Sequence, residues 1–104
     1  MFDFKEKVVL ITGASYGLGE QFAYDFARSG ADLILTARSV EQLEEVGARC
    51  REIGSRVAII PGDVSVEADV KNVISSGIKA LGRIDVLINN AGIADTRGVA
   101  AEQF

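Results

Sequence analysis

Short apolar runs alternate along this chain with segments in which apolar residues recur every three or four positions. The runs predict β-strands at residues 7–12, 31–36, 56–60 and 85–89. The periodic segments predict three helices, whose inward faces carry Leu18, Phe22 and Phe26, then Leu43, Val46, Cys50 and Ile53, then Val66, Val70, Val73 or Ile74, and Leu81. This βαβαβαβ alternation is typical of an α/β protein with a parallel sheet between helices. Because crossovers are right-handed, the expected strand order is 3-2-1-4, the first half of a doubly wound fold and one further strand.

Turn-forming residues fall between the expected elements. Each helix is followed by a glycine that can end it: Gly30, Gly54 and Gly82. Ser39 and Gln42 have the spacing of a capping box at the start of the second helix, and Ser65 is placed to cap the third. The pattern fades after Gly92, so we expect 104 residues to form one domain with one modest core.

The segment from Thr12 to Gly19, with the sequence TGASYGLG, joins the first strand to the first helix. A glycine-rich turn before a helix N-terminus presents backbone N–H groups to a phosphate, and the helix dipole favours negative charge there. Gly13 would allow the sharp turn, and Gly17 the close approach of a pyrophosphate. Gly19 would let the helix pack tightly on the sheet. The spacing differs from the common G-x-G-x-x-G fingerprint, so the loop alone is weak evidence.

Polar side chains accompany this loop and the end of the second strand. Ser15 is expected to contact the phosphates, and Leu18 is counted among the cofactor-binding residues of the loop. Tyr16 either lies over the phosphates or points to solvent. Arg38 comes about 20 residues after the loop, where this fold places the adenosine ribose. An acid there would favour NAD, but the permanently charged fork of Arg38, with Ser39 next to it as a further cofactor-binding residue, suits a 2′-phosphate and so favours NADP. The alternative is a solvated arginine beside the Ser39 cap.

The ends of the third and fourth strands supply the other candidate binding residues: Asp63, Val64, Asn90, Ala91 and Gly92. The carboxylate of Asp63 either accepts a hydrogen bond from an adenine amino group or pins the turn before Ser65, and the two roles are compatible. The pair Asn89-Asn90 either lines a cofactor cleft or satisfies backbone groups where strand pairing ends. Ala91 and Gly92 leave space for the cofactor ribose or the nicotinamide side.

Composition excludes several classes of function. The net charge of −4 argues against nucleic-acid binding, so any phosphate site must be local. With no histidine and one cysteine, a zinc site is not expected, and this chain cannot form a serine–histidine triad or an internal disulfide. Cys50 falls on an apolar helix face and is expected in the core. A free thiol, no signal-peptide pattern and no apolar run long enough for a membrane span predict a cytoplasmic protein.

Together these motifs resemble the classical short-chain dehydrogenases/reductases. The loop TGASYGLG looks like the family's T-G-x-x-x-G-x-G loop, Asp63-Val64 like its adenine-contacting segment, and residues 89–92, NNAG, like its N-N-A-G motif. The resemblance covers essentially the whole chain. It implies a Rossmann-type fold, an NAD or NADP cofactor, and hydride transfer between nicotinamide and a carbonyl or alcohol substrate. It also implies a homo-oligomer for the full-length protein.

The family's catalytic tyrosine, lysine, serine and further asparagine have no counterpart in this chain. Tyr16 and Tyr24 are followed four positions later by Glu20 and Arg28, in the wrong part of the fold. We therefore expect residues 1–104 to be the cofactor-binding N-terminal part of an oxidoreductase, with the catalytic part absent. The alternatives are a non-catalytic dinucleotide sensor or an S-adenosylmethionine methyltransferase. The lack of an acid beside Arg38 argues against the methyltransferase.

Overall fold

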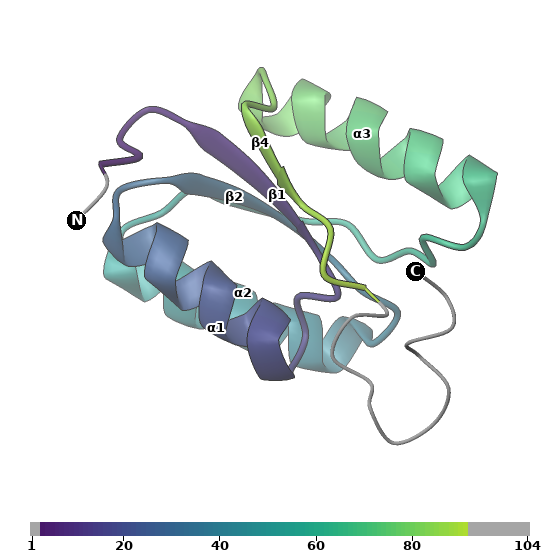
Figure 1. The fold of residues 1–104 in the computed structure, drawn as a ribbon, viewed down its shortest axis with the longest axis horizontal. Coiled ribbons are helices and arrows are strands. Elements are labelled where there is room, and N and C mark those ends of the chain that lie inside the picture. Colours follow the sequence, from purple (N-terminus) through teal and green to yellow (C-terminus); the bar gives the residue numbers. More distant parts are fainter. Residues whose placement is uncertain (1–2, 92–104) are drawn as a thin grey trace.

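The computed structural model describes residues 3–91, which form a parallel sheet with helices on both faces (Figure 1). The elements in chain order are β1 (Val8–Thr12), α1 (Gly17–Arg28), β2 (Asp32–Thr36), α2 (Val40–Ile53), β3 (Val57–Ile59), α3 (Glu67–Leu81) and β4 (Val86–Ile88). Their order in the sheet is β3-β2-β1-β4, and all three pairings are parallel. The predicted strand order is therefore confirmed.

The two faces of the sheet pack against different helices, α1 and α2 on one side and α3 on the other (Figure 1). On β1, Val9 and Ile11 belong to the larger buried cluster on the α1/α2 side, whereas Val8 and Leu10 pack in a second cluster that includes Val73 of α3. Both faces of the central strands are thus buried, which explains their continuous apolar runs. Within residues 3–91, no helix has both the length and the apolar character needed to cross a membrane.

The buried face of α1 differs from the prediction. Leu18 is 49% exposed, and the fully buried positions are Gly19, Ala23 and Ala27. Phe22 and Phe26 lie half-buried at the margin of the core. Small residues at the contact let the helix lie close to the sheet. The size of the residues, rather than their hydrophobicity, therefore determines which face of α1 is buried.

The other two helices follow the prediction in part. On α2, Leu43, Val46 and Cys50 are buried, whereas Ile53 is 39% exposed. Burial raises the pKa of the Cys50 thiol to about 11, so the thiol stays protonated in the core as expected.

On α3, Val73 is buried, but Ile74 and the N-cap residue Val66 are more than two-fifths exposed. Val70 and Leu81 are only partly buried.

The ends of the helices confirm one local prediction, the glycine that follows the first helix, and contradict two others. Gly30, at φ +94°, donates its N–H to Ala27, while Ala31 donates to Phe26, which is the Schellman arrangement. Ser39 is the N-cap of α2, but its side chain makes no capping hydrogen bond, so the predicted box with Gln42 is absent. The N-cap of α3 is Val66 rather than Ser65, because Ser65 hydrogen bonds to the preceding turn instead.

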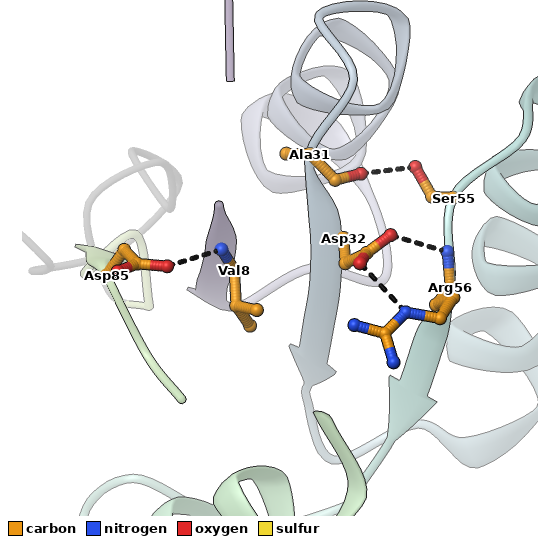
Figure 2. Close-up of polar contacts among 6 residues, drawn as sticks. All are labelled: Val8, Ala31, Asp32, Ser55, Arg56 and Asp85. Carbon is orange, nitrogen blue, oxygen red and sulfur yellow. Dashed lines mark hydrogen bonds and ion pairs between the residues drawn. The ribbon is translucent and has the colours of Figure 1, made fainter. Parts of the chain in front are cut away.

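At the amino end of the sheet, side chains satisfy backbone groups at the strand starts (Figure 2). Asp85 accepts a hydrogen bond from the backbone N–H of Val8 at 2.8 Å, which ties β1 to the start of β4 across 77 positions. Asp32 accepts bonds from the backbone N–H and the Nε of Arg56, each at 2.9 Å, and so aligns β2 with β3. Two aspartates therefore link the starts of all four strands in two pairs.

Stability is expected to depend on the ionisation of Asp85. The Val8 N–H, and after it the Arg83 guanidinium, hold the pKa of Asp85 below its ordinary value. Because the pKa is lower in the folded state, ionised Asp85 stabilises the fold above the ordinary carboxyl pKa of about 4, and this stabilisation is lost as pH falls through the lowered value. Asp85→Asn, which keeps an oxygen acceptor for Val8, should be less stable than wild type at pH 7 and approach it near pH 3. Urea unfolding at both pH values measures the gap; a gap that does not change with pH would contradict this assignment.

Candidate functional site

A cleft of about 530 Å³ opens where β1, β2 and β3 end. Ligand sites in parallel sheets lie at this edge, and small-molecule pockets span roughly 300–1,000 Å³. The cleft is lined by Gly13, Ser15, Tyr16, Thr36, Ala37, Arg38, Ser39, Gln42, Gly62, Asp63, Val64, Ser65 and Ala91. The sequence prediction placed eight of these residues in a binding site, namely Gly13, Ser15, Tyr16, Arg38, Ser39, Asp63, Val64 and Ala91. Candidate residues from all four strand ends therefore meet in one hollow.

The remaining candidates do not line the cleft. Gly17, Leu18, Gly19 and Asn90 lie outside its wall, and Gly92 lies outside the described residues. Gly17 has a φ of +60°, and a Cβ built on it meets no atom of the described residues within 4 Å. A Cβ on Gly19, by contrast, would collide with the carbonyl oxygen of Gly13. The two glycines thus have different roles: Gly17 allows the conformation of the turn, and Gly19 allows the helix to contact the loop closely.

The glycine loop is held by the residues that follow β4. The Oγ1 of Thr12 accepts hydrogen bonds from the backbone N–H groups of Asn90 at 2.9 Å and Ala91 at 3.0 Å. The side-chain Nδ2 of Asn90 donates to the carbonyl oxygen of Gly13 at 3.1 Å. A Cβ on Gly13 would lie only 3.0 Å from that Nδ2, and the φ of Gly13 is +63°. Of the two roles expected for the asparagine pair, Asn90 therefore takes that of satisfying backbone groups.

Asp63 has the geometry of a fixed, ionised acceptor. Its Oδ1 accepts hydrogen bonds from the backbone N–H and the hydroxyl of Ser65, at 2.9 and 2.7 Å. These bonds fix the turn, which is one of the two roles expected for Asp63. The hydroxyl of Ser65 and then its backbone N–H lower the pKa of Asp63. Burial opposes them, and the charge of Arg38 adds a lesser lowering effect. Its Oδ2 accepts no hydrogen bond from residues 3–91, so one carboxylate oxygen remains free at the cleft.

Arg38 is exposed on the cleft wall and makes no hydrogen bond or ion pair within the described part of the chain. Its charge lowers the pKa of Asp63, which lines the same cleft. Tyr16 is 52% exposed and Ser15 is buried at the base of the loop. The cleft therefore combines one unpaired cation with loop amides and one ionised carboxylate.

Several cleft residues were missed by the sequence prediction: Thr36, Ala37, Gln42, Gly62 and Ser65. Thr36 carried a usable signal, because it is a polar residue at the carboxyl end of an otherwise apolar strand. Gln42 was assigned to a capping box instead.

Tyr24 was excluded as a catalytic group, and its surroundings agree with that. Its hydroxyl donates to Glu20 at 2.7 Å, and burial followed by Glu20 raises the pKa of the phenol, opposite to the shift that a catalytic tyrosine needs.

Known proteins with the same arrangement were found by sequence and by structure. A family model described as short chain dehydrogenase matches residues 7–104. The 11-beta-hydroxysteroid dehydrogenase-like 4A of Arabidopsis thaliana is 51% identical over 92 residues, which cover 88% of this chain and 31% of that protein. The chain thus spans about three tenths of the length of this curated relative.

Solved structures agree with the sequence comparison. L-sorbose reductase from Gluconobacter frateurii, complexed with NADPH and L-sorbose, superposes with a TM-score of 0.85 at 35% identity, over 94% of this chain and 38% of that one. A 7 alpha-hydroxysteroid dehydrogenase, complexed with NADH and 7-oxo glycochenodeoxycholic acid, has a TM-score of 0.79 at 25% identity, over 82% of this chain and 33% of that one. The two structures hold different nicotinamide dinucleotides.

Proposed function

Since this chain belongs to the short-chain dehydrogenase family, we propose that residues 1–104 are the N-terminal, dinucleotide-binding part of an NAD(P)-dependent oxidoreductase. The complete protein would transfer a hydride between the nicotinamide cofactor and a carbonyl or alcohol substrate. Its catalytic groups would come from a segment that follows residue 104, because none of the described residues forms an acid–base pair at the cleft. The relatives, which are about three times as long, support this division.

The observation that carries the proposal is the convergence of an open glycine loop, an unpaired arginine and an ionised carboxylate on one cleft. No atom of residues 3–91 lies within 4 Å of a Cβ built on Gly17, as a pyrophosphate beside it would require. Arg38 supplies a charge that no described residue neutralises, and Asp63 keeps one oxygen available. The residues present therefore fit a nicotinamide dinucleotide.

Each wall of the cleft would hold a different part of that molecule. We assign the diphosphate to the glycine loop, the ribose 2′-phosphate to Arg38 and Ser39, and the adenine to Asp63 and Val64. Ala91 and Gly92 would leave room on the nicotinamide side. When bound, the dinucleotide supplies or accepts the hydride. The loop residues assigned to diphosphate binding are Gly13, Ser15, Tyr16, Gly17, Leu18 and Gly19.

The choice between NADP and NAD is a finer part of this proposal. Arg38 favours NADP, because a guanidinium matches a phosphate and no carboxylate stands beside it to hold a free 2′-hydroxyl. We further propose that the protein works in the cytoplasm, with its single thiol buried in the core, and that it forms a homo-oligomer. Gel filtration of the complete protein tests the assembly, and cell fractionation tests the location.

Titration of the complete protein that carries this chain with NADPH and NADH tests the function. We expect saturable binding of NADPH and weaker binding of NADH; binding of neither would overturn the proposal. Gly17→Ala should weaken NADPH binding by about tenfold or more, because the new methyl group occupies the space assigned to phosphate. Gly82→Ala is the matched control, because Gly82 also has a positive φ, +92°, and no described atom near its built Cβ, but it lies between α3 and the start of β4 and not in the glycine loop.

A further inference from the structure

Two clefts meet at Thr36. The second, of about 310 Å³, lies on the α3 side of the sheet and shares Thr36, Val64 and Ala91 with the larger one. Its other lining residues are Leu10, Thr12, Val70, Val73, Ile74, Leu87 and Asn89. Thr36 is therefore the polar residue of β2 at which the candidate nucleotide site and this largely apolar hollow adjoin.

Thr36 differs from the threonine beside it in the sheet. Thr12 and Thr36 are partners in the β1–β2 register, and both are buried. The hydroxyl of Thr12 is fully used by the residues after β4. The Oγ1 of Thr36 is buried and has no hydrogen-bond partner within residues 3–91, although the backbone oxygen of Thr36 accepts a bond from Ala14 at 3.2 Å. Burying a hydroxyl without a hydrogen-bond partner is unfavourable. Because this hydroxyl belongs to a residue that lines a cleft, a bound ligand could supply the missing partner.

The position of this hydroxyl indicates which part of a ligand it would meet. Thr36 lies two residues before Arg38, and a Cβ built on Gly62 would stand 3.6 Å from the Thr36 Oγ1. Gly62 directly precedes Asp63. The unpaired oxygen thus lies near the residue before Asp63, on the strand that leads to Arg38.

We propose that the Thr36 hydroxyl is a further cofactor contact, which hydrogen bonds to the adenosine half of the bound dinucleotide. This inference rests on the function proposed above and adds a residue that lies on the strand rather than in a loop. A group on β2 has less freedom than Arg38, so the contact would fix the orientation of the adenosine. The ligand provides the partner that the described protein groups do not.

The experiment compares Thr36→Val with Thr36→Ser in the complete protein. Valine keeps the shape and removes the hydroxyl, whereas serine keeps the hydroxyl. With 2′,5′-ADP as the probe, Thr36→Val should bind about five- to tenfold more weakly, and Thr36→Ser within about twofold of wild type. Without ligand, the Tm of Thr36→Val should equal or exceed that of wild type, because an unpaired polar atom has been removed.

A structural role would give the opposite pattern. If Thr36→Val lowers the Tm of the unliganded protein and Thr36→Ser restores it, the hydroxyl serves the fold and the inference is wrong. Thr12→Val is the reference for a structural role. It removes the hydroxyl that accepts hydrogen bonds from the backbone of Asn90 and Ala91, so it should lower the Tm. Unchanged binding of 2′,5′-ADP by Thr36→Val also overturns the inference while leaving the proposed function intact. Failure of wild type to bind either dinucleotide removes both.

Discussion

Replacing Gly19 with alanine is expected to destabilise the folded protein by about 3–5 kcal/mol, in the range of the most damaging core substitutions. Helix propensity alone predicts the reverse, because alanine is favoured over glycine inside a helix by about 1 kcal/mol. The added methyl group would collide with the Gly13 carbonyl and lie 2.7 Å from the Nδ2 of Asn90. Neither group is free to move, because the Asn90 amide is itself bonded to that carbonyl. Relief requires α1 to withdraw from the glycine loop.

Equilibrium urea unfolding of the complete protein measures this effect, provided that the transition is two-state. Gly77→Ala is the matched control, because Gly77 also lies inside a helix and faces the sheet. A Cβ there would meet the terminal Cδ1 of Ile34 at 2.6 Å, the far end of a flexible side chain. We expect its cost to stay within about 1–2 kcal/mol, since overpacking and helix propensity oppose each other. Equal costs at the two positions would show that the loop yields as easily as a side chain.

Arg38→Asp should weaken NADPH binding by about 10²–10³-fold and change NADH binding by less than about threefold. The substitution removes a charge-assisted hydrogen-bond donor and places a second carboxylate near Asp63, so that a 2′-phosphate meets repulsion instead of attraction. NADH lacks that phosphate and should be little affected. Fluorescence titration with both dinucleotides gives the two dissociation constants directly.

Two further variants separate local from general electrostatics. Arg38→Gln removes the charge without reversing it and should give an intermediate loss for NADPH. Lys71→Asp makes the same change in net charge on an exposed position of α3 outside the cleft and should alter NADPH binding by less than about twofold, because salt screens distant surface charges. Equal losses for NADPH and NADH in Arg38→Asp would show that Arg38 does not read the 2′-phosphate.

The strand order could be predicted from the sequence because the alternation of elements and the handedness of crossovers leave few parallel arrangements. Strand ends were less predictable. The third strand was predicted over residues 56–60, yet β3 is Val57–Ile59. The face of α1 was misassigned because periodicity records hydrophobicity, whereas the contact with the sheet selected Gly19 and Ala23 for their size.

The candidate site was predictable where a motif and a strand end coincide. Gly13, Arg38 and Asp63 follow three different strands and line one cleft, as parallel pairing requires. Thr36 was missed because an apolar run ending in threonine reads as an ordinary strand, and only the structure shows that the hydroxyl has no partner. Ser65 was assigned to a helix cap, because its competing bond to Asp63 cannot be read from spacing alone.

The bonds from Asn90 and Ala91 to Thr12 also bear on the order of events during synthesis. The first helix can form as soon as it leaves the ribosome, but the partners that clasp its preceding loop are 78 and 79 positions away in the chain. Contacts of such long range form late, after the intervening crossovers are complete. On the proposed function, a nascent polypeptide would therefore gain affinity for the dinucleotide only when β4 docks, and bound dinucleotide would stabilise the chains that have reached that stage.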